Sequence, residues 1–205
     1  MKIIKHNVEQ QSEEWFKLRG LKMTGSNAQA IGNAGSGLKT YIRQLIAEKY
    51  STAEKERYSN KDMERGNELE PVARMVYEFT KSIKVETIGF ITINSDEEIY
   101  KYSGVSPDGL INKDGGLEIK CPNDIEYLRI LIDGEDGIKS DYIWQIQYCL
   151  LFTKRKWWDL MLYNPNFKKS YIIFKIYPDK EKHKKILEGL KLGVKMIKKL
   201  ENKLK

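Results

Sequence analysis

Cysteine and histidine are scarce: the chain of 205 residues contains two of each. Cys121 and Cys149 are too few for a disulfide framework or a four-cysteine metal site, and we expect both to be small, reduced core residues. His6 and His183 lack neighbours that would make a zinc site or a nucleophilic pair. The scarcity argues against disulfide-rich, zinc-dependent and thiol-dependent proteins.

Long apolar runs are missing too. No stretch is long and apolar enough to cross a bilayer, and residues 1–10 hold only a brief apolar patch, which argues against a signal peptide. Repeats, low-complexity segments and clear linkers are likewise absent from the sequence. We therefore expect a cytoplasmic protein without a membrane segment, folded as a single domain over residues 1–205.

The remaining composition is that of a globular protein with a positive charge. Hydrophobic residues make up 40% and charged residues 32%, a balance that allows a sizeable core. The formal net charge of +7 favours an acidic partner such as nucleic acid. A basic surface alone identifies no ligand, so the argument for function depends on motifs.

Hydrophobic periodicity and turn residues predict helices first and then a sheet that one helix interrupts. Ser26 with Gln29 resembles a capping box, and Ser140 with Asp141 resembles another helix start. This order predicts an α/β fold with a central mixed β-sheet flanked by helices. The expected helices are 12–20, a short one after 26, 38–49, 63–81, one beginning near 140, and an amphipathic one at about 179–205. The expected strands are 85–94, 100–105, a hairpin at 110–121, 157–163 and 171–177, and the polar segment 51–62 is expected to be a loop.

Two carboxylates and a lysine stand in and beside the predicted hairpin. Side chains alternate between the faces of a strand, so Glu118 and Lys120 point the same way. The turn at 112–116, rich in Gly and Asp, can fold the chain back and bring Asp108 beside Glu118. Carboxylate oxygens suit Mg²⁺, a metal-activated water can attack phosphorus, and an ammonium group can hold that water or offset charge. The pattern therefore predicts a metal-dependent site for hydrolysis at phosphorus.

A purely structural interpretation of the same residues is open. Asp108-Gly109 and Asp114-Gly115 are ordinary turn formers, and Glu118 can pair with Lys120 on an exposed strand face. So short a pattern also matches by chance in many chains.

Other polar residues have two interpretations each. Glu70, in the helix before the sheet, is either a third metal ligand or a solvated carboxylate. Gln145 and Gln147 lie in an apolar helix, where an amide either satisfies core backbone or reaches into a site. Arg19 and Ser26 either grip a phosphate, through paired hydrogen bonds and a helix start, or serve as a surface residue and a cap.

Five motifs occur in the order of a known family. The chain resembles the phage recombination exonucleases of the lambda-exonuclease/YqaJ type, within the PD-(D/E)xK nuclease superfamily. No single motif is decisive, but five in order, between about residues 15 and 165, are specific. They are Arg19 with Thr24-Gly-Ser26, Glu70-Pro71, Ser106-Pro-Asp108-Gly-Leu110, Leu117-Glu118-Ile-Lys120-Cys-Pro122, and Tyr142-Ile-Trp-Gln145-Ile-Gln-Tyr148.

The resemblance implies a restriction-endonuclease-like core and an activity. Family members degrade the 5′-ended strand of linear double-stranded DNA with Mg²⁺, leaving 3′ single-stranded tails for recombination by strand annealing. They commonly act with a single-strand annealing protein, and some form homo-oligomers, including ring-shaped trimers. The resemblance therefore implies DNA ends as the substrate, with a phage or prophage origin and the host cytoplasm as the compartment.

The resemblance also implies residue roles. Lys120 would position the attacking water, and Gln145 would support it. The residues implied for binding Mg²⁺, with two ions in the site and Mn²⁺ as a substitute, are Asp108, Glu118, Glu70 and the backbone carbonyl of Ile119. The residues implied for holding the terminal 5′-phosphate are Arg19, Ser26 and Ser106.

One departure from the family concerns the segment after the Lys-Cys-Pro motif. Some relatives carry an arginine there that contacts the 5′-phosphate, whereas this chain has Asn123-Asp-Ile-Glu126, with Arg129 the nearest arginine. A strong preference for a 5′-phosphorylated end is therefore not implied by the resemblance alone. Two rival functions stay open: an endonuclease on the same core, and a non-catalytic protein that binds DNA ends.

Overall fold

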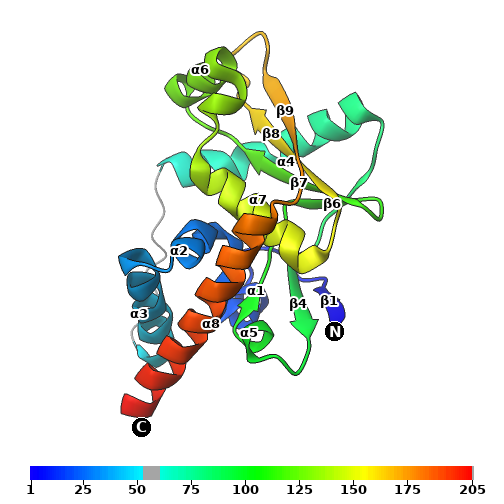
Figure 1. The fold of residues 1–205 in the computed structure, drawn as a ribbon. Coiled ribbons are helices and arrows are strands. Elements are labelled where there is room, and N and C mark those ends of the chain that lie inside the picture. Colours follow the sequence, from blue (N-terminus) through cyan, green and yellow to red (C-terminus); the bar gives the residue numbers. More distant parts are fainter. Residues whose placement is uncertain (53–60, 205) are drawn as a thin grey trace.

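A mixed five-stranded sheet forms the centre of the computed structural model, which describes residues 1–52 and 61–204 (Figure 1). Its strand order is β3-β6-β7-β8-β9; β7 and β8 run parallel, and the other neighbours run antiparallel. The mixed sheet confirms the predicted fold class. Most of the predicted loop 51–62 lies outside the described residues. The strands of the sheet are β3 (Val85–Glu86), β6 (Gly109–Ile111), β7 (Gly115–Lys120), β8 (Trp157–Tyr163) and β9 (Tyr171–Ile176).

Helices cover both faces of this sheet (Figure 1). The helix α4 packs against β7 and β8 on one face, and α7 packs against β8 on the other. Behind α7 lie α2, α3 and α8, which build the larger core with it. The helices are α1 (Glu13–Arg19), α2 (Ala28–Asn33), α3 (Ser36–Tyr50), α4 (Lys61–Lys81), α5 (Glu98–Lys101), α6 (Asp124–Asp133), α7 (Ser140–Thr153) and α8 (Lys180–Lys203).

The alternation of side chains along β7 decides what faces each layer. Leu117 and Ile119 belong to the smaller apolar cluster, where they pack under Tyr77 of α4. Glu118 and Lys120 therefore point to the opposite face, toward α7. The close pairing of β7 with β8 needs glycine at 116, because an added Cβ would lie 2.2 Å from the Trp158 ring. This strand thus buries an apolar row on one side and presents a polar row on the other.

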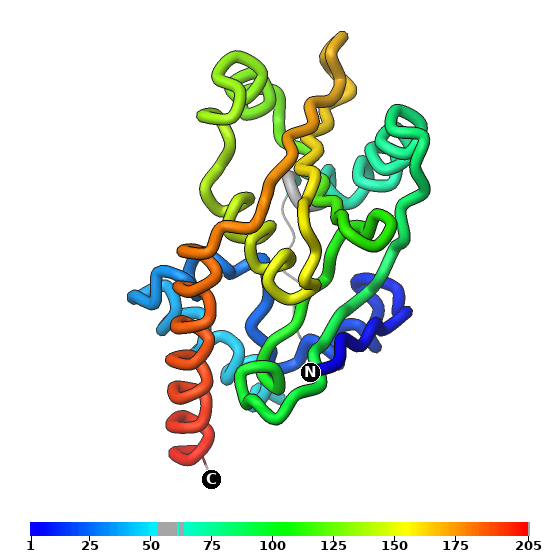
Figure 2. The backbone as a smooth tube through the Cα atoms, turned by 45° about the vertical axis from the view of Figure 1, so that its right-hand side comes forward, coloured from blue at the N-terminus to red at the C-terminus, as the bar shows by residue number. Residues whose placement is uncertain are grey.

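The C-terminal helix lies across the N-terminal half of the chain. Figure 2 shows α8, in red, running beside the blue α2. The backbones approach so closely that an added Cβ at Gly189 would lie 1.8 Å from the carbonyl oxygen of Ile31. Ile186, Leu190 and Ile197 form the buried face of α8, so the predicted amphipathic helix is confirmed.

Two predicted strands differ from the structure. The predicted strand 85–94 is two strands in different sheets, because β4 (Phe90–Asn94) leaves the central sheet and pairs antiparallel with β1 (Lys2–His6), which the sequence did not predict. Residues 100–101 of the predicted strand 100–105 belong instead to the short helix α5, and β5 (Ser103–Gly104) follows, which pairs parallel with β2 (Met23–Thr24). Val105 forms an antiparallel bridge with Ile91 of β4, so the predicted pairing with 85–94 is confirmed in part. The Ser103 hydroxyl donates to the carbonyl of Ile99 and so satisfies a helical turn rather than a strand.

Helix starts were predicted with mixed success. Ser12 accepts a hydrogen bond from the Trp15 backbone N–H and caps α1 as expected. The capping box at Ser26 is wrong: α2 has no side-chain cap, and Gln29 instead donates to Ser140. Ser140 is the first residue of α7 and does not cap it.

The helix α6 was not predicted either. Asn123 accepts from the Glu126 backbone N–H and starts α6, a pattern that the sequence does contain. Within the described residues, no helix is long and apolar enough to span a membrane.

Candidate active site

The hairpin of β6 and β7 brings Asp108 beside the C-terminal half of β7. Gly109 pairs with Leu117, and the Ile119 backbone N–H donates to Asp108 Oδ2 at 2.7 Å. At the far end of the hairpin, Arg155 Nη1 donates to three carbonyl oxygens of its turn, at 3.0, 2.9 and 2.6 Å. The register therefore sets the first carboxylate next to Glu118, as the sequence pattern predicted.

Glu118 is the centre of a closed hydrogen-bond triangle. Its side chain is fully buried. Lys120 Nζ donates to Glu118 Oε1 at 2.6 Å and to Gln145 Oε1 at 3.1 Å, and Gln145 Nε2 donates to the same Glu118 oxygen. Three side chains from β7 and α7 thus fix one another in one geometry.

The cluster holds its charges at an electrostatic cost. Burial, then the neighbouring charge of Glu118, raises the pKa of Asp108 well above its usual range. Burial also raises the pKa of Glu118, against the opposing pull of Lys120. Burial disfavours the ammonium of Lys120, but the two carboxylates outweigh it and raise its pKa. Two buried carboxylates with a single ammonium leave negative charge that a further cation would neutralise.

The residues present fit a divalent metal ion. Glu118 Oε2 is buried and has no hydrogen-bond partner among the described residues, so one carboxylate oxygen is left for a ligand. No group of three His, Cys, Asp or Glu side chains within residues 1–52 and 61–204 is arranged to hold a metal ion unaided. Glu70, the expected third carboxylate, lies on the same cavity but pairs with Arg74 at 2.5 Å. Water and phosphate oxygens would therefore complete the coordination, as is usual for Mg²⁺.

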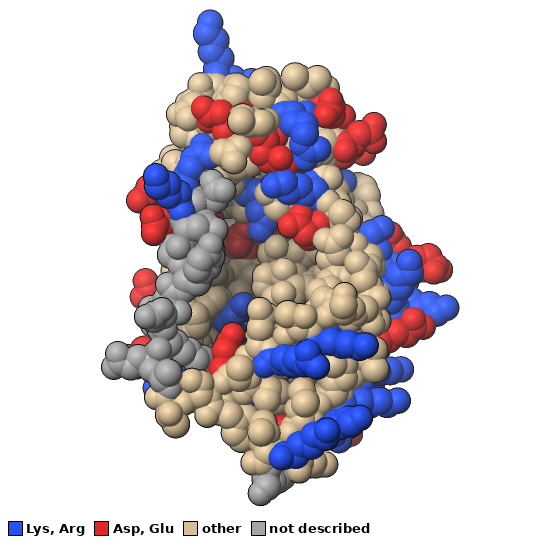
Figure 3. All heavy atoms as spheres, turned by 90° about the vertical axis from the view of Figure 1, so that its left-hand side faces the viewer, with Lys and Arg blue, Asp and Glu red and all other residues tan. Residues whose placement is uncertain are grey.

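These residues line a cavity of about 430 Å³ between α4, β7, α6 and α7. It includes Asp108, Glu118, Ile119, Lys120 and Gln145. A neighbouring cavity of about 560 Å³ shares Asp108 and two residues of α4, Asn67 and Glu70, with it. Figure 3 shows a hollow on one face of the molecule, with acidic and basic side chains both inside it and at its rim.

A second polar cluster adjoins the first through the segment that carries Asp108. Arg19 donates to Ser106 Oγ at 3.1 Å and to Thr24 Oγ1 at 3.3 Å, and Thr24 Oγ1 lies 3.3 Å from Ser26 Oγ. Burial lowers the pKa of Arg19. The structure thus brings together the three residues for which the sequence predicted phosphate binding.

The structure also separates the two glutamines, of which the family resemblance favoured Gln145. Gln147 donates to the carbonyl of Tyr177 and accepts from the Asp179 backbone N–H, so it joins α7 to the start of α8. Gln145 is the one in the cavity. Both interpretations offered for a buried amide therefore apply, one to each residue.

Three site residues were missed by the sequence reasoning. Trp15 donates to Ser106, and nothing in its local pattern indicates a partner so distant in the chain. Tyr142 lines the cavity that contains Asp108 and Glu118, with Lys120 Nζ 5.3 Å from its ring centroid. Arg74 pairs with Glu70, and its i,i+4 spacing is a signal that could have identified it.

A family model for the YqaJ-like viral recombinase domain matches residues 14–156, which include both clusters. The chain belongs to this family. The YqaJ-like match contains every residue that the sequence assigned to the site. No curated protein matches the sequence.

Solved structures agree with this assignment. The alkaline exonuclease LHK-Exo from Laribacter hongkongensis is 28% identical, with a TM-score of 0.79 over 94% of this chain and 98% of that one. A structure of LHK-Exo in complex with dAMP, also 28% identical, gives a TM-score of 0.83 over 94% and 96%. A phage-related exonuclease from Haemophilus somnus 129PT, 14% identical, shares the fold, with a TM-score of 0.71 over 92% and 99%. These similarities support an alkaline-exonuclease-like nuclease.

Proposed function

We propose that this YqaJ-like protein is a Mg²⁺-dependent exonuclease that degrades the 5′-ended strand of linear double-stranded DNA and leaves 3′ single-stranded tails. One observation carries the proposal. The partly buried cluster of Asp108, Glu118, Lys120 and Gln145 adjoins Ser106, which precedes Asp108 by two residues and accepts a hydrogen bond from Arg19. A site for hydrolysis therefore adjoins a site for a phosphate.

Each residue of the first cluster has a distinct task in this proposal. Asp108 and Glu118, with the Ile119 carbonyl and Glu70, would hold two Mg²⁺ or Mn²⁺ ions. When bound, these ions would activate water and neutralise charge on the reacting phosphate. Lys120 would hold the attacking water with its ammonium group.

Gln145 keeps the ammonium in place. Its carbonyl oxygen accepts from Lys120 and its amide donates to Glu118, so it restricts both side chains at once. Preorganised charges of this kind lower the barrier because they need no rearrangement during the reaction.

The second cluster, of Arg19, Ser26 and Ser106, supports the proposed 5′-to-3′ direction of digestion. A guanidinium and hydroxyl groups bind phosphate oxygens well, and the terminal phosphate of a DNA strand is normally at its 5′ end. We propose that Arg19, Ser26 and Ser106 hold that phosphate while the next linkage is cut. The product would then be a mononucleotide, the class of molecule to which dAMP, bound by LHK-Exo, belongs.

A role in recombination requires a DNA substrate and a partner protein. We propose DNA ends as the substrate and a single-strand annealing protein as the protein that receives the 3′ tail. A homo-oligomer, such as a ring-shaped trimer, would keep the enzyme on its substrate between cuts.

Strand polarity is the decisive test. Linear duplex labelled at the 5′ end or at the 3′ end of one strand is incubated with Mg²⁺ or with EDTA. We expect immediate release of a labelled mononucleotide from the 5′-labelled duplex, late release from the 3′-labelled duplex, and none with EDTA. Early loss of the 3′ label would contradict the polarity.

The same assay separates the rival functions. A closed circular duplex stays intact with an exonuclease but is cut by an endonuclease. A protein that only binds ends releases no nucleotide from any substrate. Asp108→Ala supplies the matched control, because it should abolish hydrolysis while leaving the fold and DNA binding intact.

A further inference from the structure

The hydroxyl of Ser106 has an unusual set of neighbours. Trp15 Nε1 donates to Ser106 Oγ at 2.9 Å, and Arg19 Nη1 donates to the same oxygen at 3.1 Å. An indole N–H and a guanidinium are donors only. Ser106 must therefore be the acceptor in both hydrogen bonds.

A serine hydroxyl has two lone pairs and one proton. Both lone pairs are taken by donors, so the proton is left to point elsewhere. Among residues 1–52 and 61–204, no acceptor lies within hydrogen-bonding distance of it. Ser106 thus presents a donor without a partner, next to the charged group of Arg19.

The indole also holds Arg19. The guanidinium carbon lies 4.1 Å from the centroid of the Trp15 ring, close enough for a cation–π interaction. The same Nε1 donates to the carbonyl of Gly89 at 2.9 Å, which fixes the plane of the indole. One side chain therefore orients both donors of the second cluster.

A ligand for this arrangement must accept hydrogen bonds and carry negative charge, which a terminal phosphate does. We infer that Trp15 is a positioning residue for the 5′ end of the DNA: its N–H makes Ser106 a donor toward the terminal phosphate. The inference rests on the proposed function and adds a residue through which the preference for a 5′-phosphorylated end is set.

The physical reason for a preference lies in the direction of the proton. Without the indole N–H, one lone pair of Ser106 is free and the carbonyl of Gly89 loses its donor. The hydroxyl then accepts only the hydrogen bond from Arg19, so its proton is no longer directed toward the phosphate. The phosphate would lose a directed hydrogen bond, while a DNA end without a phosphate would lose nothing.

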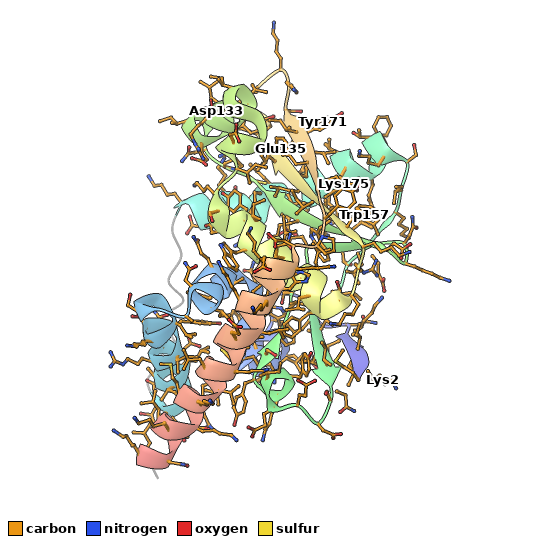
Figure 4. The ribbon with its side chains drawn as sticks, in the orientation of Figure 1. Lys2, Asp133, Glu135, Trp157, Tyr171 and Lys175 are labelled. Carbon is orange, nitrogen blue, oxygen red and sulfur yellow. The ribbon has the colours of Figure 1, made fainter. Side chains whose placement is uncertain are left out.

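The test compares linear duplexes that carry a 5′-phosphate or a 5′-hydroxyl. The ratio of their kcat/KM values is measured for the wild type, Trp15→Phe, Ser106→Ala and the double variant. Phenylalanine keeps an aromatic ring under Arg19 but has no N–H. The matched control is Trp157→Phe. Trp157 also has a cation over its ring, since Lys175 Nζ lies 3.4 Å from the ring centroid. This pair lies at the other end of β8 from the strand position beside Lys120 (Figure 4).

We expect the wild type to prefer the phosphorylated end. Trp15→Phe and Ser106→Ala should each reduce the ratio about tenfold, the scale of one lost hydrogen bond to a charged group. The double variant should lose no more than Ser106→Ala alone, because both changes remove the same bond. The ratio for Trp157→Phe should not change.

Different failures have different meanings. A wild type without any preference would overturn the proposed 5′-phosphate site and this inference with it. A wild type with a preference that Trp15→Phe retains would overturn the inference alone. Additive losses in the double variant would assign Trp15 to stacking on Arg19 rather than to orienting Ser106. If Trp15→Phe melts early, 3-benzothienylalanine at the same position replaces the N–H by sulfur in a ring of similar shape and gives the same readout.

Discussion

Asp108→Asn should make the metal-free protein more stable while it destroys the metal response. Asparagine has nearly the same shape, and its carbonyl oxygen can still accept from the Ile119 backbone N–H. The change removes one of two buried negative charges, and Lys120 keeps its contact with Glu118. Relief of this kind is worth about 1 kcal/mol, and each kcal/mol shifts the melting temperature of a chain of this size by roughly 2–4 °C.

The stability of the metal-free protein should fall as the pH rises from acidic to neutral. A carboxyl whose pKa is raised on folding binds its proton more tightly in the native state than in the unfolded state. Its contribution is fully present below the ordinary pKa, 3.8 for Asp108, and is lost as the pH rises toward the raised native value. The metal-free wild type should therefore lose stability between acidic and neutral pH, and Asp108→Asn should lose less.

With metal bound, the wild type should become more stable than Asp108→Asn. A ligand present at a hundred times its Kd stabilises the native state by about 2.7 kcal/mol, which raises the melting temperature by roughly 5–11 °C. The wild type should show that rise with Mg²⁺ or Mn²⁺, and Asp108→Asn should show little of it. Melting curves followed by circular dichroism at pH 5 and pH 7.5, with EDTA or metal, measure both effects.

The control for this prediction is Asp114→Asn. Asp114 is an exposed carboxylate in the turn of the same hairpin, paired with Lys156 on the surface. The substitution Asp114→Asn should change neither the melting temperature of the metal-free protein nor its rise on adding metal. Equal metal stabilisation of Asp108→Asn and the wild type, or a lower metal-free stability of the variant, would refute the reasoning.

Three further substitutions test the surrounding structure. Lys120→Met should lower the rate of hydrolysis by about 10²–10⁴-fold at an unchanged circular dichroism spectrum, and a rate near that of the wild type would contradict its assignment. Gln145→Leu should lower the rate. Gln147→Leu should leave the rate at 25 °C unchanged and cost about 1–3 kcal/mol in urea unfolding, because it removes two hydrogen bonds to the backbone between α7 and α8. Arg155→Met removes three hydrogen bonds to the hairpin turn and should cost about 2–3 kcal/mol of unfolding free energy, with normal hydrolysis below the melting transition.

Patterns along the chain were sufficient wherever a single strand or helix carries the information. Fixed periodicities and turn residues predict that Glu118 and Lys120 share one face of a strand, that a turn precedes Leu117, and that one face of α8 is apolar. The structure has all three features. Local capping was less reliable. Ser26 stands before a helix as a cap should, but its hydroxyl contacts Thr24 instead.

Pairing between distant segments was beyond the sequence. The strand predicted at 85–94 divides between two sheets because β1, more than 80 residues earlier, takes the second half as its partner. Hydrophobic alternation is the same for either partner, so no local pattern distinguishes them. The single-domain organisation and the chemical role of each site residue remain predictions.

The sequence by itself determined the mixed α/β class and the motif order of a YqaJ-like nuclease, and it predicted the candidate site of two carboxylates, a lysine and a phosphate-binding set. Only the tertiary structure showed that Gln147 joins α7 to α8, that Arg74 pairs with Glu70, and that Trp15 donates to Ser106. The physical reason is that side-chain type and periodicity are local properties, whereas a hydrogen bond between residues 91 positions apart exists only once packing has placed them together.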